Sequence, residues 1–164
     1  MTTFRKHLFV PGKRDYIKGK KRPAVGCILC AILANDENVQ RLEVTRDDLF
    51  CVSVNLYPYN PGHLMIFPLR HVVDPRQLTR DEVLALHAWQ EKVLERLDRL
   101  YQPLGYNIGM NVGEASGASI DHLHQHIVPR YHKELGFVDI LNGSKIMIED
   151  PQVTLARLRE AFAG

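Results

Sequence analysis

Three histidines, His122, His124 and His126, alternate with two other residues and form the group with the clearest chemical potential in the sequence. On a strand, side chains alternate between two faces, so the three imidazoles would point the same way. The Cα atoms of His122 and His126 would then lie about 13 Å apart, which argues against one metal ion bound by all three. Three imidazoles on one face cost too much desolvation and mutual repulsion for an ordinary core. The cluster therefore indicates a functional site.

Two kinds of chemistry suit this cluster. His122 and His124 form an H-x-H pair, which is a common way to chelate a metal on a strand. Alternatively, a neutral imidazole can attack phosphorus and form a phosphoramidate, which a second nucleophile then breaks. The ordinary pKa of histidine, about 6.5, makes the neutral form available near pH 7. That reaction needs donors for the phosphate oxygens. The loop at 113–119 offers small residues whose backbone amides can approach an anion, together with Ser116 and Ser119. The sequence contains no Walker phosphate loop.

Cys27 and Cys30 form a C-x-x-C motif, which is typical of a redox pair or of half a zinc site. The chain has no second C-x-x-C, so a zinc site would need two histidines to complete it. We consider His71 and His122 as candidates, although spacing alone does not select them from eight histidines. Two reduced thiols without a metal remain an alternative, and a redox pair is disfavoured because a thioredoxin-like βαβ context is missing. Cys51 falls in a strand pattern and is interpreted as a small core residue.

The segments that must position these residues include several strands. Residues 49–56 alternate apolar side chains, a Pro/Gly turn follows at 57–62, and 63–68 is apolar, which predicts an antiparallel pair. The same alternation predicts strands over 106–112 and 120–130. We therefore expect four or five antiparallel strands.

Two helices are predicted beside the strands. The longer spans 79–102, where Thr79 and Glu82 match a capping box. The shorter begins at Asp150, with Pro151 in the first turn. Strands and helices together predict an α+β fold of two layers. The long helix argues against a metal-binding β-barrel of the jelly-roll type, which has no place for it.

Composition places the chain among ordinary globular proteins. It has 164 residues and a mass of 18.8 kDa, with 45% apolar and 24% charged residues. These values suit one compact domain and exclude a disordered or fibrous chain. The sequence has no run of 18 apolar residues that would predict a membrane span, and its N-terminus lacks the apolar core of a signal peptide. Three cysteines make a poor disulfide framework, so we expect a cytoplasmic location.

Charge is distributed unevenly along the chain. Residues 1–22 hold eight Lys or Arg and one acidic residue, a net charge of +7, whereas residues 23–164 have a net charge of −5. We predict an irregular basic arm over 1–22 and a single domain over 23–164. The arm is a solvated leader, a segment that packs on the domain, or a segment near an anionic substrate. Nucleic acid is a less favoured partner, because aromatic residues are not interleaved with the basic ones in a repeating way.

The histidine segment resembles the histidine-triad (HIT) superfamily. Residues 122–128 match its H-φ-H-φ-H-φ-φ motif, in which φ is apolar, except at Gln125. Asn55, the PGH at 61–63 and the Gly/Ser loop occur in the family's order. The resemblance covers about residues 23–130.

Further segments resemble particular branches of the superfamily. The C-x-x-C motif and Arg70-His71 are similar to zinc-containing members. The NLYPYNPGH stretch at 55–63, the NGSK at 142–145 and the leader segment LFVPGKRDYI are most similar to bacterial diadenosine-tetraphosphate phosphorylase-like members.

The resemblance implies a fold, a reaction and partners. The fold is HIT-like, with a five-stranded antiparallel sheet, one long and one short helix, and a homodimer whose sheets join into ten strands. The reaction is nucleotidyl hydrolysis or transfer on dinucleoside polyphosphates of the diadenosine-tetraphosphate type, through a covalent nucleotidyl-histidine that phosphate or water resolves. A structural zinc ion fits the resemblance, and no organic cofactor is implied.

The resemblance also implies a role for each site residue. His124 would be the nucleophile, while His126 and His63 would contact phosphate or orient the catalytic imidazole. The metal ligands of zinc-containing members correspond to Cys27, Cys30, His71 and His122. Substrate contacts correspond to Asn55 at the ribose, and to Asn111 and Ser119 near the α-phosphate and the leaving group, with Ser116 and Gly117 added from the anion-binding loop.

Alternatives remain within the same fold. Gln125 replaces an apolar residue of the motif, but this change does not decide between hydrolysis and phosphorolysis. The chain could instead hydrolyse nucleoside phosphoramidates or AMP-lysine. It could also be a non-catalytic nucleotide-binding protein.

Overall fold

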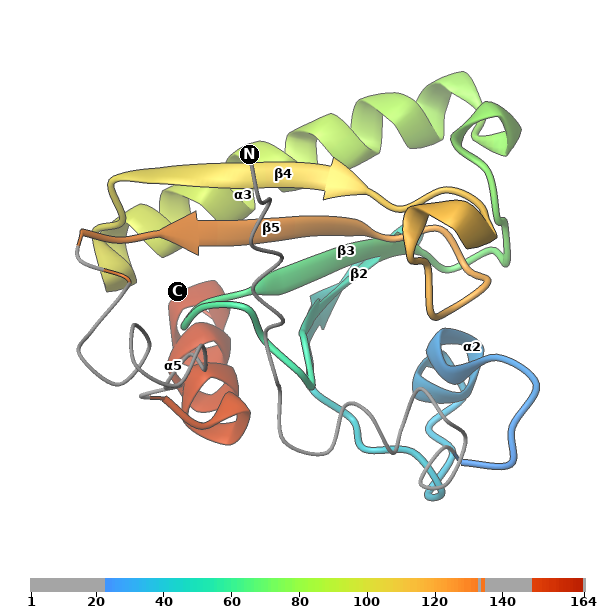
Figure 1. Ribbon diagram of the computed structural model, residues 1–164, viewed down its shortest axis with the longest axis horizontal. Coiled ribbons are helices and arrows are strands. Elements are labelled where there is room, and N and C mark those ends of the chain that lie inside the picture. The colour runs from blue at the N-terminus through green and yellow to red at the C-terminus, as the bar shows by residue number, and fades with distance from the viewer. Residues whose placement is uncertain (1–22, 133, 135–148, 164) are drawn as a thin grey trace, which may run out of the picture.

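The computed structural model describes residues 23–132, 134 and 149–163 (Figure 1). The predicted basic arm at 1–22 and the NGSK segment at 142–145 lie outside the described residues. None of the described helices combines the length and apolar character needed to cross a membrane. In chain order, the described elements are α2 (Ile28–Leu33), β1 (Glu43–Arg46), β2 (Phe50–Val54), β3 (Leu64–Pro68), the 3-10 turn η1 (Pro75–Gln77), α3 (Arg80–Tyr101), β4 (Gly105–Met110), the 3-10 turn η2 (Glu114–Ser116), β5 (Gln125–Arg130) and α5 (Pro151–Ala163).

The five described strands form one antiparallel sheet in the order β1-β2-β3-β5-β4. β2 pairs with β3, with Val52 opposite Ile66, which confirms the antiparallel pair predicted around the Pro/Gly turn. β5 joins β3 to β4, where Ile127 lies opposite Ile108. The predicted α+β fold with a five-stranded antiparallel sheet is therefore confirmed. β4 forms one edge of this sheet.

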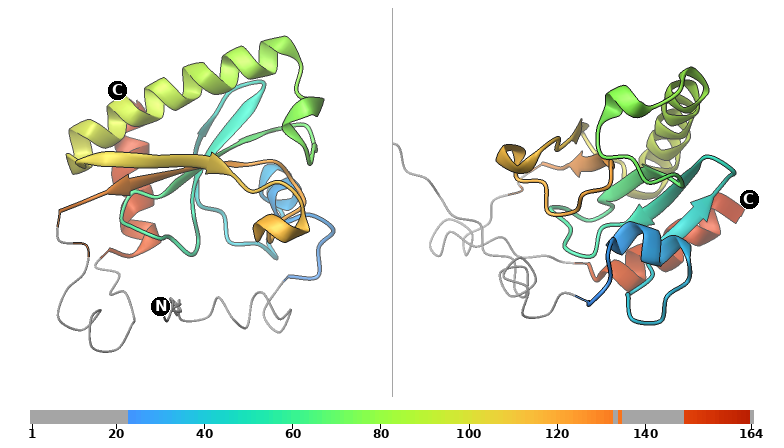
Figure 2. Two further views of the ribbon diagram at one scale, coloured as in Figure 1. Left: turned by 45° about the horizontal axis from the view of Figure 1, so that its top comes forward. Right: turned by 90° about the vertical axis from the view of Figure 1, so that its right-hand side faces the viewer.

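Helices cover both faces of the sheet, as Figure 2 shows, so the two-layer arrangement predicted from the sequence is wrong: α2, which was not predicted, packs in a cluster separate from that of α3 and α5. Because side chains alternate along β2, Phe50 and Val52 join the core cluster that contains α3 and α5, whereas Cys51 joins a second cluster around α2. Cys51 is fully buried, which confirms its prediction as a core residue, and burial raises the pKa of its thiol to about 12. With both faces covered, β2 is buried along its whole length.

α3 forms where the sequence predicts the long helix. The N–H of Glu82 donates to Thr79 Oγ1 at 3.2 Å and the N–H of Thr79 donates to Glu82 Oε2 at 2.7 Å, so the capping box is confirmed. Trp89 packs in the core and its Nε1–H donates to Asp47 Oδ2 at 2.6 Å. The helix ends at Tyr101, and the residue that caps it, Gln102, takes a left-handed conformation with φ of 47°.

α5 also begins as predicted, at Pro151. The side chain of Asp150 accepts a hydrogen bond from the N–H of Gln152 at 2.7 Å and so satisfies a donor of the first turn. Leu155 and Leu158 are buried in the cluster shared with α3. α5 thereby closes the larger core.

Two elements and one boundary differ from the sequence-based expectation. α2 and β1 were not predicted, because elements of six and four residues are too short to show a period. β5 begins only at Gln125, so the predicted strand over 120–130 is wrong for its first five residues. There the N–H of Leu123 donates to the carbonyl of Val72 at 2.6 Å, in the loop after β3, instead of joining the ladder of a strand. His122 and His124 therefore lie outside the strand, and strand alternation does not set their directions.

Gly62 shapes the turn that delivers His63 to the sheet. Its φ of +77° is unfavourable for residues with a side chain. A Cβ on this residue would also lie 3.2 Å from Leu97 Cδ2 and 3.3 Å from Pro129 Cγ. The side chains of Leu97 in α3 and Pro129 in β5 can pack this closely against the turn because residue 62 is glycine.

The capping box predicts a pH-dependent contribution to stability. Arg70 and the N–H of Thr79 hold the pKa of Glu82 down at about 2. A carboxylate whose pKa is lowered by folding stabilises the protein above its unfolded pKa and loses that effect as pH falls. Glu82→Gln keeps an oxygen for the cap but cannot pair with Arg70, so we expect a loss of about 1 kcal/mol at pH 7 that shrinks toward zero near pH 2. Denaturant unfolding of the variant and the wild-type protein at several pH values measures this difference in unfolding free energy.

The matched control is Asp81→Asn, which removes an exposed carboxylate from the same turn of α3. A constant difference in unfolding free energy between Glu82→Gln and the wild-type protein across pH 2 to 7 would contradict this account of Glu82.

Candidate functional site

His124 is buried just before β5, with 5% of its surface exposed. Its Nδ1 lies 2.7 Å from the carbonyl oxygen of His122. A carbonyl can only accept, so Nδ1 carries the proton and the lone pair of the neutral ring sits on Nε2. Burial lowers the pKa of His124, while the bond to the carbonyl raises it by less. The neutral ring with an Nε2 lone pair is the form that can act as a nucleophile.

A second pair of imidazoles has its protons fixed in the same way. The N–H of Tyr59 donates to His63 Nδ1 at 3.1 Å, so His63 carries its proton on Nε2. That nitrogen lies 3.0 Å from His126 Nδ1 and donates to it. His126 in its neutral form consequently carries its own proton on Nε2. Its ring centroid lies 4.8 Å from that of His124, so an acceptor nitrogen and a donor imidazole stand side by side.

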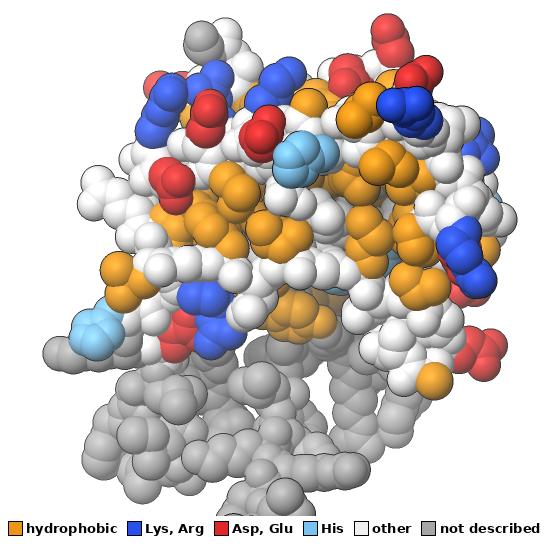
Figure 3. Space-filling model, turned by 90° about the horizontal axis from the view of Figure 1, so that it is seen from above, with side chains coloured by type: hydrophobic (Ala, Val, Ile, Leu, Met, Phe, Trp, Pro, Cys, Tyr) orange, Lys and Arg blue, Asp and Glu red, His pale blue; other side chains and the backbone are white. Residues whose placement is uncertain are grey.

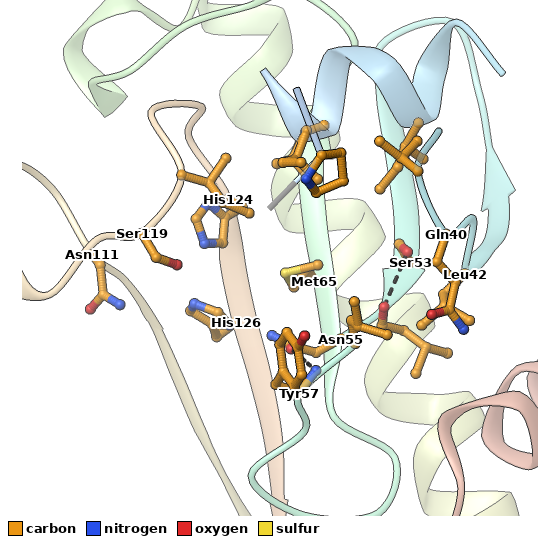
Figure 4. Close-up of a pocket in the computed structure, with 18 of the residues that line it drawn as sticks. Gln40, Leu42, Ser53, Asn55, Tyr57, Met65, Asn111, Ser119, His124 and His126 are labelled. Carbon is orange, nitrogen blue, oxygen red and sulfur yellow. Dashed lines mark hydrogen bonds between the residues drawn. The ribbon is translucent and has the colours of Figure 1, made fainter. Parts of the chain in front are cut away.

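The imidazoles of His124 and His126 open on a pocket of about 440 Å³. Figure 4 shows His124 and His126 at one end together with Asn111 and Ser119, and Ser53 at the other end. Asn55 lies between the two ends, and its Oδ1 accepts the N–H of Tyr57 at 2.9 Å. The Asn55 amide nitrogen can therefore serve as a donor to a molecule in the pocket. The pocket therefore has one end lined by polar side chains that could contact a charged group, and Asn55 offers a further polar group part-way along it.

The structure brings most predicted substrate residues to the pocket and leaves one out. Asn55, Asn111, Gly117 and Ser119 all line it, as do His124 and His126. Ser116 does not line the pocket. Its hydroxyl donates to the carbonyl of Gly113 at 2.6 Å within η2, so we withdraw it as a phosphate donor. His63 lies behind His126 and is fully buried.

Sequence reasoning missed the apolar wall of the pocket. Ile28, Leu29 and Ile32 of α2 form part of it, and Met65 and Ser53 belong to the paired strands β3 and β2. The spacing of the three α2 residues fits one face of a helical turn, which is a weak signal in so short a segment. The remaining apolar lining comes from Pro23, Val39, Leu42, Val54, Leu56 and Ile120.

A second cluster joins Cys27, Cys30, His71 and His122, and their ligand atoms all lie within 4.8 Å of one another. His122 Nδ1 is 3.6 Å from Cys27 Sγ and 3.5 Å from Cys30 Sγ, and His71 Nδ1 is 3.3 Å from Cys30 Sγ. A tetrahedral ion with bonds of about 2.3 Å to sulfur and about 2.05 Å to nitrogen would hold adjacent S and N atoms about 3.6 Å apart. The four predicted residues therefore fit a tetrahedral ion such as zinc.

The protonation chemistry of this cluster also suits a cation. His122 donates its Nε2–H to the carbonyl of Pro68 at 2.9 Å, which directs the Nδ1 lone pair at the cysteines. Burial lowers the pKa of His122 to about 4, so its ring is neutral near pH 7. Desolvation, followed by the neighbouring Cys27, raises the pKa of Cys30 to about 11. The thiolate of Cys30 would therefore need a bound cation to form near pH 7.

The geometry removes the hypothesis that His122 and His124 chelate one ion as a pair. His122 Nδ1 faces the cysteines. His124, in contrast, donates its Nδ1–H to the backbone and lines the pocket. The three histidines of the motif thus divide between two sites.

A family model described as HIT domain matches residues 37–133, more than half of the chain. The chain belongs to the HIT domain family. This HIT protein is 41% identical over 107 residues to AP-4-A phosphorylase of Mycobacterium tuberculosis, a match that covers 65% of this chain and 55% of the relative. It is 31% identical over 123 residues to the asymmetrical bis(5'-nucleosyl)-tetraphosphatase of Schizosaccharomyces pombe, covering 73% and 66% of the two chains. The HIT protein thus spans about half the length of the mycobacterial relative.

Solved structures share the fold of this HIT protein. A Zn-bound histidine triad family protein from Mycobacterium smegmatis superposes with a TM-score of 0.69, covering 84% of this chain and 94% of the other at 24% identity. A histidine triad nucleotide-binding protein from Sulfolobus tokodaii gives a TM-score of 0.69, covering 84% and 92% at 22% identity. At these identities the likeness supports the fold alone.

The tetrahedral fit predicts that this HIT protein binds zinc. We expect protein purified without chelator to hold about one zinc ion per chain by elemental analysis. Cys30→Ser removes one thiolate and should leave the protein with little zinc, because three remaining ligands bind more weakly. Cys51→Ala is the control, since Cys51 lies outside the cluster in β2. Clearly substoichiometric zinc in wild-type protein never exposed to chelator would contradict the site.

Proposed function

We propose that this HIT protein cleaves dinucleoside polyphosphates, such as diadenosine tetraphosphate, by transferring a nucleotidyl group to His124 and then to phosphate. The observation that carries the proposal is the hydrogen bond from His124 Nδ1 to the carbonyl of His122, which leaves the Nε2 lone pair for attack. The pocket beside His124, with its apolar wall and polar end, has room for a nucleotide.

In the first step, His124 Nε2 attacks the α-phosphorus of the substrate. The N–P bond forms while the bridging P–O bond breaks, and ATP leaves diadenosine tetraphosphate with the electron pair of that bond. The imidazole becomes cationic because Nδ1 keeps its proton, and the carbonyl of His122 stabilises that charge through the same hydrogen bond. The adenylyl group remains on His124.

In the second step, an oxygen of phosphate attacks the same phosphorus. The N–P bond breaks, its electron pair returns to Nε2, and ADP forms. His126, which carries its proton on Nε2 and stands beside His124, supports both steps by donating to oxygen at the reacting phosphorus. The same end of the pocket is lined by Gly117, Ser119 and Asn111. Backbone amides at the first two residues and the side-chain amide of Asn111 would donate hydrogen bonds to the remaining phosphate oxygens.

Other residues would bind substrate away from the reacting atoms. The Asn55 amide would contact the ribose, and α2 would pack against the base. We favour phosphate over water as the second nucleophile because the mycobacterial relative, which is 41% identical, is an AP-4-A phosphorylase. Cys27, Cys30, His71 and His122 would hold a structural zinc ion, which supplies no step of the reaction.

We also propose that the protein is a homodimer that pairs through β4, as the family resemblance implies. β4 is a sheet edge of six residues, and edge strands of this kind are sites for pairing with another chain. Leu104, Ile108 and Val112, on and beside this strand, are exposed. Figure 3 shows hydrophobic side chains gathered on the face that carries α3 and β4. Joining two such edges would produce a sheet of ten strands.

Product analysis tests the reaction. We expect diadenosine tetraphosphate to give ADP and ATP only when phosphate is present. AMP and ATP without phosphate would identify water as the acceptor, and no turnover in either condition would contradict the proposal.

His124→Ala should reduce turnover by more than about a thousandfold, because the nucleophile is lost, while AMP binding persists. A His124→Ala protein with near-wild-type turnover would contradict the assignment of the nucleophile.

The dimer predicts the mass in solution. Light scattering should give twice the chain mass of 18.8 kDa. Ile108→Lys places a charge on the paired edge and should shift the protein toward monomer, whereas Val153→Lys, on an exposed position of α5, should not. A wild-type monomer at micromolar concentration would contradict the proposed pairing.

A further inference from the structure

We propose that the four-ligand site positions the nucleophile, with His122 as a positioning residue whose ring is held by the metal and whose backbone carbonyl holds the His124 ring. The role of His124 as nucleophile rests on the function proposed above. The connection between the two sites rests on contacts of the structure itself.

The ring of His122 is fixed from two sides. Its Nε2–H donates to the carbonyl of Pro68 at 2.9 Å, and its Nδ1 lies 3.5 to 3.6 Å from the sulfur atoms of Cys27 and Cys30. The residue is 1% exposed. An ion at the four ligands would bond to Nδ1 and leave the ring little freedom to rotate.

The same residue supplies the acceptor that orients His124. The carbonyl oxygen of His122 receives the Nδ1–H of His124 at 2.7 Å. The carbonyl of His122 shares a peptide unit with the Leu123 N–H, which donates to Val72 next to the ligand His71. An ion that fixes both the ring of His122 and His71 would therefore restrict the rotation that turns this carbonyl away. The metal ligand and the nucleophile are thereby linked through one residue.

The chain has few other supports at this point. His122 and His124 precede β5, so no strand ladder holds their backbone. Within the part of the chain that the structure describes, the segment is tied by the ring of His122 at Pro68 and by the Leu123 N–H, which donates to Val72. Both of these acceptors lie in or next to the loop that also carries the ligand His71. The four ligands therefore join α2, this loop and the segment before β5.

The pocket wall, in contrast, has independent support. Leu29 and Ile32 of α2 are buried against Phe67 and Met65 in their own core cluster. Loss of the ion should consequently disturb the direction of the His124 ring more than the apolar wall that would contact the base. This difference separates a positioning role from a general role in folding.

The predicted consequence of metal loss is a change of tautomer at His124. Without a fixed carbonyl at His122, the neutral ring can place its proton on Nε2, and that nitrogen then has no lone pair for attack. We expect nucleotidyl transfer to His124 to slow by about 10- to 100-fold, which is the usual effect of removing a group that orients a residue at a metal site. AMP binding should change little.

The test compares full-length protein loaded with zinc, the same protein stripped with a chelator, and His71→Ala. His71 is the exposed ligand, so its removal costs little packing. Two-bond ¹H–¹⁵N spectra of histidine-labelled protein report which nitrogen carries the proton, and comparison with His124→Ala assigns the His124 signals. Single-turnover labelling measures nucleotidyl transfer, and titration with AMP measures binding. Zinc-loaded Cys51→Ala is the matched control, since it changes a buried cysteine outside the cluster.

The proposal expects an Nδ1-protonated His124 in the zinc-loaded wild type and in Cys51→Ala, and a mixed tautomer with slower transfer in the stripped protein and in His71→Ala. An unchanged tautomer and rate in folded, zinc-free protein would overturn it. If the stripped protein and His71→Ala both unfold, Cys30→Ser is examined at lower temperature. Unfolding of Cys30→Ser as well would mean that the four-ligand site is needed for folding, and this result would also overturn the proposal. The spectra do not depend on turnover, so absence of nucleotidyl transfer in the zinc-loaded wild type would count against the proposed function alone.

Discussion

One hydrogen bond, from His124 Nδ1 to the carbonyl of His122, organises the site of this HIT protein. Because its acceptor is a backbone oxygen, the bond fixes the position of the proton in a neutral ring and the direction of the lone pair opposite it. The bond forms in residues 122 to 124, which lie outside the strand pattern and precede β5. The strands, the loop after β3 and α2 all contribute to holding that short segment in place.

The backbone assigns protons at the other histidines as well. Tyr59 donates to His63, His63 donates to His126, and Pro68 accepts from His122, so each of these rings has a defined donor and acceptor nitrogen. Four chemically identical imidazoles thereby take different roles, two in contact with the pocket, one behind them and one at the cysteine cluster. Main-chain groups distinguish these rings where the residue type alone cannot.

Much of this arrangement could be predicted from the sequence where the signal is long or repeated. α3 has a capping box and several turns of apolar periodicity, and α5 has an Asp-Pro start, so both appear close to where they are expected. α2 and the beginning of β5 could not be predicted, since a six-residue helix shows no period and a single backbone bond from Leu123 to Val72 decides where the strand starts. Ser116 illustrates the same limit, because a serine in a glycine-rich loop can serve a ligand or its own turn, and here it bonds to Gly113.

The position of α2 has a consequence for how the pocket can change in this chain. This helix of six residues follows Cys27, contains Cys30, and presents Ile28, Leu29 and Ile32 to the pocket. Because Cys27 caps this helix and Cys30 lies within it, a larger side chain at one of the wall residues would act on the two sulfur atoms as well as on the pocket. Natural variation in the shape of the pocket should therefore accumulate at Ser53 and Val39, which line the pocket from β2 and a loop and carry no ligand atom.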